Sequence, residues 1–443
     1  MTYVTARAPG ALPVLGHAWP LLRRPFAFFK ELPRYGDLAV VRIGSKPVYV
    51  PCHPDLVRKV LTDDRTFDKG GLLFEKSTRD LFGNGLATCP HADHRKQRRL
   101  MQPAFHHQRL EQYGITMVDA FHRVTGSWGA GKVIDVYAEM FRVALQAAAR
   151  TLFGIPTDDE TFERFQQCAE AAFPSTIRRS LAPGVVSSFP LPANRRYRDT
   201  LRLFHRTVDQ VIAQYQDAEE DYGDLISILF RTGPERLTER EVHDQVTTIL
   251  VAGTETIAAN LSWALHLLTQ NQQYERRLRK ELKVVLQGDN AAPQNLSELT
   301  FARQVIVESL RLYPPVWLTT RTVTHPTRLA DTAIPAGATI GISPLSMHYS
   351  AKNFDQPSRF NPDRWSNEKS AGSLRAAYIP FGGGARKCIG DTFGIMETTL
   401  LLASLVQKWK FRPTAESDAS PRALESMLRP RRLLLSCEEA GKG

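Results

Sequence analysis

The sequence predicts a mainly helical protein with a smaller β part. Helical periodicity of apolar residues continues from Ala92 for about two hundred residues. The segment Val40–Pro51 alternates and is rich in Val and Tyr, which predicts a hairpin with its turn near Gly44-Ser45. No repeat, low-complexity stretch or obvious linker interrupts the 443 residues. We therefore expect residues 1–443 to form a single domain that can enclose a bulky cofactor.

The N-terminal half begins with an extended, proline-punctuated segment over Pro9–Gly16. After the hairpin, residues 54–64 have a helical pattern. Gly70–Thr88 is glycine-rich with apolar residues between, which predicts a long loop, and loops of this length are usually functional. Glycine and proline clusters predict breaks in the helical region near residues 129–131, 154–156, 182–193 and 233–234.

The C-terminal half contains the longest predicted helix, over residues 238–270. A second helix over 298–312 ends before Pro314-Pro315, because proline cannot continue a helix. The remaining expected elements are strand-like pieces over 318–342, a loop-rich stretch over 350–387, a helix over 390–408 and strands near 424–437.

Composition excludes several classes of protein. Hydrophobic residues make up 42% and charged residues 23%, as in globular proteins, and the net charge is +11. The basic residues are scattered and no nucleic-acid-binding motif is present, so we expect no nucleic-acid partner. Five separated cysteines without a CxxC pair indicate a reducing compartment rather than zinc or disulfides. Neither a signal peptide nor an apolar run of about 18 residues is evident, which predicts a cytoplasmic protein without a membrane span.

The strongest motif is a glycine-rich loop that ends in a cysteine, directly before the helix expected over 390–408. Near a helix N-terminus, backbone N–H groups stabilise the thiolate of Cys388. The glycines let the backbone pass close to a flat cofactor, and Arg386 offers a cation for a carboxylate or phosphate. A phosphate-binding loop is disfavoured because the Gly-Lys-Ser/Thr ending is missing. The other cysteines are interpreted as small buried side chains: Cys52, Cys89, Cys168 and Cys437.

The loop resembles the haem-binding loop of the cytochrome P450 family, whose pattern Phe-x-x-Gly-x-Arg-x-Cys-x-Gly is completed by residues 381–390. The resemblance implies the cytochrome P450 fold, with haem b buried between the 238–270 helix and this loop. It implies that Cys388 is the axial thiolate ligand of the iron and that Phe381 contacts the cofactor. Thiolate ligation favours O–O cleavage at haem iron.

Two further segments resemble family motifs that stabilise the fold. Glu308 and Arg311 are three positions apart, so they share one helix face, and their apolar neighbours suggest burial. An exposed ion pair would contribute little, whereas a buried pair needs further partners. The segment 360–365 matches the family segment that supplies such a partner, which implies a structural network of Glu308, Arg311 and Arg364.

The segment Ala252-Gly253-Thr254-Glu255-Thr256 resembles the oxygen-activation segment of the family. A glycine inside a helix costs about 0.5–1 kcal/mol relative to alanine, so Gly253 should serve a purpose. Small side chains at 252 and 253 would leave room for dioxygen and substrate. The Thr256 hydroxyl would hydrogen-bond dioxygen and relay a proton, with Glu255 connecting it to solvent. The alternative is a plain buried helix whose threonines hydrogen-bond to the preceding turn.

The resemblance also implies which residues bind the two haem carboxylates. His94 and Arg98 are four positions apart and therefore share a helix face. Arg321 follows the Pro314-Pro315 break at the position of another carboxylate-binding arginine. We expect Arg98, Arg321 and Arg386 to clamp the carboxylates, with His94 donating a hydrogen bond.

The implied activity is haem-thiolate monooxygenation, in which one oxygen atom of O2 enters an apolar small molecule. Ferredoxin and a ferredoxin reductase are the expected electron donors, and Arg95 and Arg99 could contribute to a docking surface. The chain looks similar to actinobacterial members that oxidise cyclic sesquiterpenes in secondary metabolism. Hydroxylation of a macrolide, steroid or fatty acid stays open, as does a peroxide-dependent haem enzyme or a protein that only binds an apolar ligand.

Four segments are expected over the haem: Gly70–Ala87, Leu250–Ala252, Val316–Thr320 and Ser426–Leu428. An apolar lining is usual for ligand pockets and argues against a strongly ionic substrate. The apolar residues expected to line the substrate pocket are Leu72, Leu73, Phe74, Leu81, Phe82, Leu86, Val316, Trp317, Leu318, Met427 and Leu428.

Overall fold

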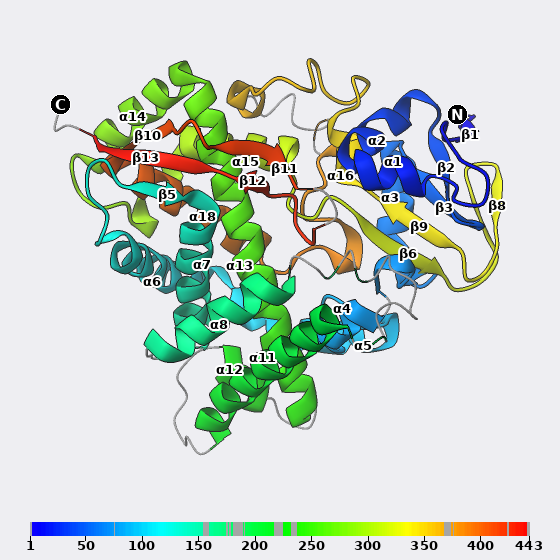
Figure 1. Cartoon of the computed structure of the whole chain (residues 1–443), viewed down its shortest axis with the longest axis horizontal. Coiled ribbons are helices and arrows are strands. Elements are labelled where there is room, and N and C mark those ends of the chain that lie inside the picture. Colours follow the sequence, from blue (N-terminus) through cyan, green and yellow to red (C-terminus); the bar gives the residue numbers. More distant parts are fainter. Residues whose placement is uncertain are drawn as a thin grey trace.

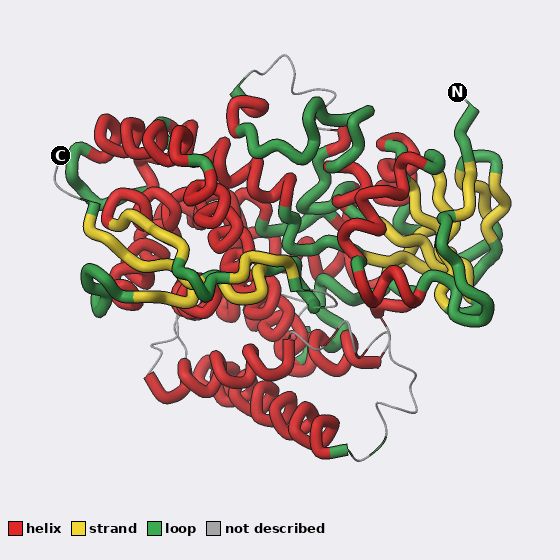
Figure 2. The backbone as a smooth tube through the Cα atoms, turned by 45° about the horizontal axis from the view of Figure 1, so that its top comes forward, coloured by secondary structure: helices red, strands yellow, loops and turns green. Residues whose placement is uncertain are grey.

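Helices fill most of the computed structural model, and most strands lie in two groups, one near each end of the molecule (Figures 1 and 2). This confirms the mainly helical fold class with a smaller β part. The structure describes residues 2–74, 76–153, 159–173, 176, 179, 189, 191–216, 225–231, 237–366, 374, 376–422 and 425–440. The breaks expected at 154–156 and 233–234, and most of 182–193, lie outside the described residues.

The helices divide into a small N-terminal set and a large central set. The N-terminal set is α1 (Ala18–Arg23), α2 (Pro25–Glu31), α3 (Pro54–Thr62), α4 (Lys76–Phe82) and α5 (His91–Met101). The larger set is α6 (His107–Thr125), α7 (Val136–Phe153), α8 (Asp159–Ala172), α11 (Pro192–Gln216), α12 (Leu225–Arg231), α13 (Glu239–Gln270), α14 (Gln272–Leu286), α15 (Thr300–Leu312), α16 (Pro344–His348) and α18 (Asp391–Lys408).

The largest sheet lies in the N-terminal part of the molecule (Figure 1). Its strands, in spatial order, are β1 (Thr5–Arg7), β2 (Leu38–Ile43), β3 (Lys46–Pro51), β9 (Thr339–Ile342), β6 (Thr319–Val323) and β4 (Phe67–Lys69). The predicted hairpin is β2–β3. The antiparallel pair β4–β6 places Lys69 opposite Arg321.

The other strands form three small sheets. One has the order β10 (Trp409–Pro413), β13 (Leu434–Glu439) and β5 (Val133–Asp135). The two remaining pairs are β11 (Asp418–Pro421) with β12 (Pro430–Arg432), and β7 (Thr327–Leu329) with β8 (Thr332–Ile334).

The helix α13 runs through the middle of the molecule and packs against α7, α15 and α18 (Figure 1). Apolar residues surround it on most sides, so it is buried along most of its length, as expected for a helix inside a large core. Thr238 accepts a hydrogen bond from the Glu241 N–H, and the Glu241 carboxylate accepts one from the Thr238 N–H. This capping box sets the start of the helix one residue after the predicted position.

Three local predictions need correction. Gly70–Thr88 is not one long loop, because it contains a 3-10 helix over Leu72–Phe74 and α4. The extended entry segment is followed by α1 and α2, which were not predicted. The C-terminal β region starts earlier than expected, since β10 and β11 precede residue 424. No helix among the described residues combines the length and apolar character needed to cross a membrane.

Two histidines join three helices that are distant in sequence. His205 of α11 places Nε2 2.9 Å from the Asp80 carbonyl oxygen of α4. Its Nδ1 lies 2.9 Å from Nε2 of His243 on α13. His243 Nδ1 lies 2.6 Å from a carboxylate oxygen of Asp209, also on α11. The pair therefore ties α4 to the two longer helices.

Candidate active site

A cavity of about 330 Å³ lies between α13 and the cysteine loop. It is bounded by α5, α13, β6, the loop before α18 and the first turns of α18. The structure brings nine of the predicted site residues together around it: His94, Arg98, Ala252, Gly253, Thr256, Arg321, Phe381, Arg386 and Cys388. The tenth, Glu255, does not line the cavity.

The cysteine loop is held by backbone contacts. The Cys388 N–H donates to the Phe381 carbonyl oxygen at 3.0 Å. Gly384 has φ +65°, and a Cβ at this position would lie 2.1 Å from the Leu61 carbonyl oxygen, so glycine is required here. Of the five cysteines, all among the described residues, only Cys388 opens into the cavity, while the other four are buried elsewhere. Burial raises the pKa of the Cys388 thiol, and the Gly390 N–H acts in the opposite direction.

Cations gather at one side of the cavity. The guanidinium of Arg321 is 3% exposed, and its Nε and Nη1 have no hydrogen-bond partner among the described residues. Burial lowers the pKa of Arg321 to about 10. A buried cation without a partner is costly, so an anion in the cavity would be strongly favoured.

Two of the other predicted cations already have protein partners. Arg98 donates to the Lys387 carbonyl oxygen at 2.6 Å, which ties α5 to the cysteine loop. Arg386 donates to the Cys89 carbonyl oxygen at 2.6 Å and to Asp68 Oδ1 at 2.7 Å. Its charge is therefore partly balanced by the protein, whereas that of Arg321 is not.

Sequence reasoning missed Lys69, which lines the cavity beside Arg321. Burial, followed by the charges of Arg321 and Arg386, holds the pKa of Lys69 well below its usual value. Burial, together with Arg386 and Arg98, lowers the pKa of His94 to about 4, so its imidazole is neutral near pH 7 and can donate one N–H. Lys69 lies between the helix expected over residues 54–64 and the loop expected over Gly70–Thr88, where no sequence pattern pointed to a functional residue.

The middle of α13 faces the opposite side of the cavity. Thr256 donates its hydroxyl hydrogen to the Ala252 carbonyl oxygen at 2.6 Å, so the hydrogen bond to the preceding turn is present at a residue that also faces the cavity. The oxygen of that hydroxyl keeps lone pairs with which it can accept a hydrogen bond. At Gly253, an added Cβ would meet only the Ala148 Cβ within 4 Å, at 3.9 Å. Packing within the protein therefore does not explain this glycine.

Glu255 is buried and turned away from the cavity toward the C-terminal loop. Ser426 donates its hydroxyl hydrogen to Glu255 Oε2 at 3.0 Å. Burial raises the pKa of Glu255 to about 7, against the opposing effects of Ser426, Arg429 and Tyr137. Arg429 in turn binds Glu425, with 2.5 Å between Nε and Oε2. Ser426 belongs to a segment that was expected over the haem, but it does not line the cavity.

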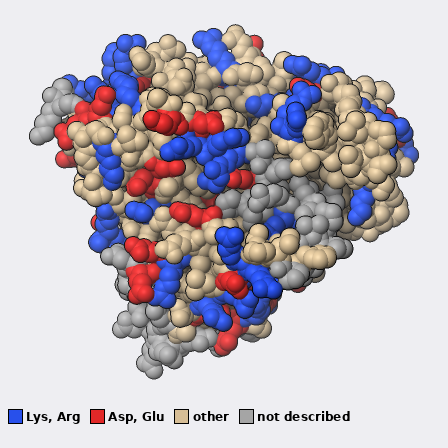
Figure 3. Space-filling model, viewed as in Figure 1, with Lys and Arg blue, Asp and Glu red and all other residues tan. Residues whose placement is uncertain are grey.

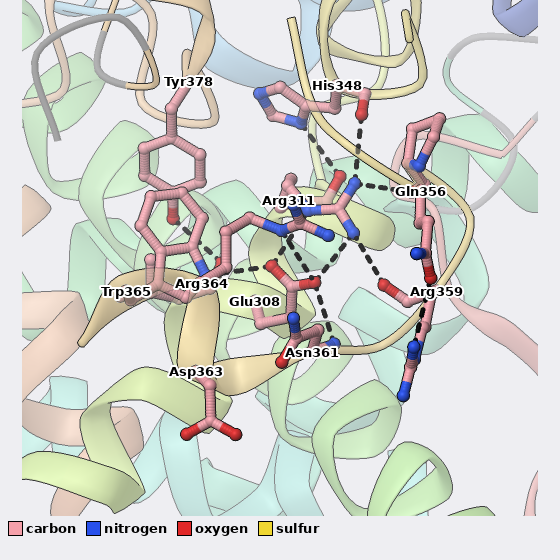
Figure 4. Close-up of polar contacts among 12 residues, drawn as sticks. Glu308, Arg311, His348, Gln356, Arg359, Asn361, Asp363, Arg364, Trp365 and Tyr378 are labelled. Atoms are coloured by element: carbon pink, nitrogen blue, oxygen red, sulfur yellow. Dashed lines mark hydrogen bonds and ion pairs between the residues drawn. The ribbon is translucent and has the colours of Figure 1, made fainter. Parts of the chain in front are cut away.

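Glu308 and Arg311 form the centre of a buried polar network (Figure 4). Both side chains are 0% exposed, and Arg311 donates to both carboxylate oxygens, at 2.9 and 2.8 Å. The carboxylate also accepts from the Asn361 N–H at 3.1 Å and from Trp365 Nε1 at 2.9 Å. The predicted third member, Arg364, places Nε 3.6 Å from Glu308 Oε1, an ion pair without a hydrogen bond.

The same network reaches the segment before the cysteine loop. Arg311 donates to the carbonyl oxygens of His348, Pro357 and Arg359 (Figure 4). The His348 ring accepts from the Ile379 N–H at 3.0 Å. This chain of contacts holds residue 379, two positions before Phe381, and the part of His348 was not predicted.

Part of the cavity lining is apolar, but only some of the apolar residues expected there are present. Of the residues named above for the substrate pocket, Leu86 and Val316 line the cavity, as does Ala87 from the expected segment Gly70–Ala87, together with the unexpected Leu152 and Ile249. Leu73, Trp317 and Leu318 instead line a separate space of about 50 Å³ under α1 and α2. These three residues pack against the N-terminal helices, which were absent from the predicted fold.

The site combines one accessible thiol, a helix with small residues facing it, and an unpaired buried cation. These features fit haem, because a cysteine thiolate can ligate its iron and cations can balance its two carboxylates. The sequence profile of the cytochrome P450 family matches residues 7–436, and the chain belongs to this family. The protein is therefore a cytochrome P450 monooxygenase that binds haem b with a cysteine thiolate on the iron. It uses O2, electrons from redox partners and an apolar substrate.

Three individual members of the family are similar to the chain along nearly its whole length. The chain is 42% identical to pentalenene oxygenase of Streptomyces avermitilis, over 98% of this chain and 97% of the relative. It is 39% identical to cyclooctatin synthase of Streptomyces melanosporofaciens, over 95% of this chain and 93% of the relative. It is also 39% identical to cyclooctat-9-en-7-ol 5-monooxygenase of the same organism, over 93% and 90% of the two chains.

Proposed function

We propose that this monooxygenase hydroxylates a cyclic terpene, with a sesquiterpene hydrocarbon as the first candidate. The observation that carries the proposal is the 42% identity to pentalenene oxygenase along nearly the whole chain. The apolar part of the cavity lining supports the proposal, because Leu86, Leu152, Ile249 and Val316 are uncharged and can contact a hydrocarbon. A macrolide, steroid or fatty acid is the alternative.

Cys388 is the residue that would supply the thiolate ligand. Arg321 and Lys69 would bind one haem carboxylate, and Arg98, Arg386 and the neutral His94 would bind the other. When bound, haem supplies the activation of dioxygen, and the thiolate favours O–O cleavage. Ala252 and Gly253 leave space on the α13 side of the cavity, while the Glu308 network keeps the cysteine loop in position.

Thr256 and Glu255 would deliver protons. The Thr256 hydroxyl faces the cavity, and its hydrogen is held by the Ala252 carbonyl oxygen, so it would donate a proton by turning from this acceptor toward the cavity. Glu255 precedes it in α13 and can both hold and release a proton near neutral pH, since burial raises its pKa to about 7. Ser426 connects Glu255 to the half-buried C-terminal loop, which is the direction from which a proton would arrive.

A ferredoxin, reduced by a ferredoxin reductase, is the proposed electron donor. A basic groove lies outside the cysteine loop and is lined by Arg95, Arg98, Arg99, Arg109 and Lys387. Clustered cations of this kind steer an acidic partner toward the surface nearest Cys388. Exchanging Arg95 for glutamate should slow reduction by ferredoxin and reduce its dependence on salt, without changing reduction by dithionite.

The test of the substrate class is an optical titration of the ferric holoenzyme. A cyclic sesquiterpene hydrocarbon should produce a saturable shift from low to high spin, and Val316→Phe should weaken its binding at least about tenfold by narrowing the cavity. Val284→Phe, on the exposed face of α14, is the matched control and should change nothing. A shift with only a steroid, macrolide or fatty acid would retain the monooxygenase and refute the terpene.

A further inference from the structure

The N-terminal part of the molecule exposes a concentration of large apolar side chains. Leu12, Val14, Leu15, Trp19 and Leu22 are all exposed, from 43% at Leu12 to 84% at Val14. Single exposed apolar residues are normal on a soluble surface, but a contiguous group marks an interaction site. We refer to these five residues as the N-terminal apolar patch.

The patch is continuous in space because of its local structure. Trp19 and Leu22 are three residues apart and therefore share one face of α1. The Ala18 N–H donates to the Leu15 carbonyl oxygen, which holds the preceding turn against the start of this helix. Leu12 and Val14 belong to the same turn, which is closed by the Leu12–Gly16 bridge. No residue of α1 is fully buried; Leu21 packs against the core beneath the helix, whereas Trp19 and Leu22 stay exposed.

The turn is rigid, and its tip is strained. The buried His17 ring accepts from the Arg42 N–H at 2.8 Å and contacts the Ala8 carbonyl oxygen at 2.8 Å, which fastens the turn to β2. Val14 adopts φ +62°, a left-handed conformation that is unfavourable for a β-branched residue. The strained backbone of Val14 lowers stability without burying the side chain in return, and strained residues cluster at functional sites.

The surroundings of the patch are purely basic. Residues 2–30 contain no Asp or Glu. Arg7, Arg23 and Arg24 are exposed, as are Arg42 and Lys46 of the adjoining hairpin, and none of the five is in an ion pair within the part of the chain that the structure describes. Arg23 lies over the Trp19 ring, 4.6 Å from its centroid. The space-filling view shows this N-terminal part, on the right, mainly in tan and blue (Figure 3).

We propose that the N-terminal apolar patch binds the surface of an anionic lipid bilayer. Leucine, valine and tryptophan side chains suit insertion between headgroups, and a surrounding ring of arginine and lysine suits anionic headgroups. Because residues 2–30 contain no acidic side chain, the rim presents a single sign of charge, which matches a uniformly anionic lipid surface. Binding of this kind lies on the membrane and does not span it.

The test is co-sedimentation of the purified holoenzyme with vesicles. Vesicles of mixed phosphatidylglycerol and phosphatidylcholine should bind the protein at least about tenfold more strongly than vesicles of phosphatidylcholine alone. Exchanging Arg23 for glutamine should weaken this binding about fivefold. Val14→Asn and Trp19→Gln should each weaken it about fivefold or more, since each removes an apolar side chain from the bilayer.

The variants also separate binding from stability. Asparagine tolerates a positive φ better than valine, so Val14→Asn should raise the thermal midpoint while lowering membrane binding. Val284→Asn, at a 73% exposed position on α14, is the matched control and should bind vesicles as the wild type does. Equal binding by the patch variants, or an equal loss in the control, would overturn the proposal. Self-association without vesicles that the patch variants abolish would overturn it too, by assigning the patch to a second copy.

Discussion

Replacing Glu308 by alanine tests the buried network most directly. The change removes the carboxylate and leaves Arg311 with its three carbonyl acceptors but without a balancing charge. It also leaves the Asn361 N–H and the Trp365 ring N–H without their acceptor. All of these groups lie around a pair that is 0% exposed, so water cannot replace the lost contacts without opening the structure.

The expected loss of unfolding free energy is large. Breaking a buried ion pair by removing one partner costs about 3–5 kcal/mol. Each orphaned buried N–H costs a further ~1–3 kcal/mol, although such contributions are not additive within one network. Because native proteins are stable by only about 5–15 kcal/mol, Glu308→Ala should yield little folded protein. Glu308→Gln keeps one acceptor oxygen and should be damaged less.

The assay is urea unfolding followed by circular dichroism, with the yield of haem-loaded protein as a second measure. Asp199→Ala is the matched control, because Asp199 and Arg202 have the same i,i+3 spacing and a 2.6 Å contact but are 65% and 67% exposed. This change should cost less than about 1 kcal/mol. If Glu308→Ala unfolds within about 1 kcal/mol of the wild type and retains haem, the network does not stabilise the fold as argued.

Three further changes test the site. Cys388→Ser should abolish the red-shifted Soret band of the reduced carbon monoxide complex, and a variant that keeps this band would remove Cys388 as the ligand. Thr256→Ala should lower product formed per electron at least about tenfold and release peroxide instead, measured by product and peroxide assays; unchanged coupling would argue against proton delivery by Thr256. Burial raises the pKa of Glu255 from 4.5 to about 7, so only the unfolded chain ionises this carboxyl between those pH values. The unfolding free energy of the wild type should therefore fall by about 3 kcal/mol relative to Glu255→Gln as the pH rises from below 4.5 to above 7, and parallel pH profiles would contradict this pKa.

The parts of the fold that could be predicted are those governed by local patterns. The start of α13 follows from a capping box, and the end of α15 follows from Pro314-Pro315. Both signals are visible in the sequence. The short strand β4 was missed because its three residues depend on pairing with β6, more than two hundred residues away. The helices α1 and α2 were missed because prolines at 20 and 25 read as breaks, although Pro25 occupies the favourable first turn of α2.

In the candidate site, too, features set by a local pattern could be predicted, and features set by distant partners could not. The loop around Cys388 and the Glu308–Arg311 pair were predictable because their spacing within one segment carries the information. Lys69 and Ser426 were not, because their roles depend on partners 252 and 171 positions away, Arg321 and Glu255. These contacts come from the pairing of β4 with β6 and from the hydrogen bond between α13 and the C-terminal loop, which no local pattern encodes.

The pair of histidines between α4, α11 and α13 has a consequence that follows from counting hydrogens. A carbonyl and a carboxylate only accept, so His205 Nε2 and His243 Nδ1 must each carry a hydrogen. The 2.9 Å contact between the remaining two nitrogens needs a third, whereas two neutral imidazoles carry only two. All three contacts can therefore be hydrogen bonds only when the pair carries one additional proton.

Burial, with the charges of His243 and Arg240, lowers the pKa of His205, which opposes the uptake of this additional proton. When it leaves, the two facing nitrogens become two lone pairs at hydrogen-bond distance, and one of the three contacts must break. The attachment of α4, which follows the Lys69 segment beside the cavity, is therefore coupled to the acidity of the medium.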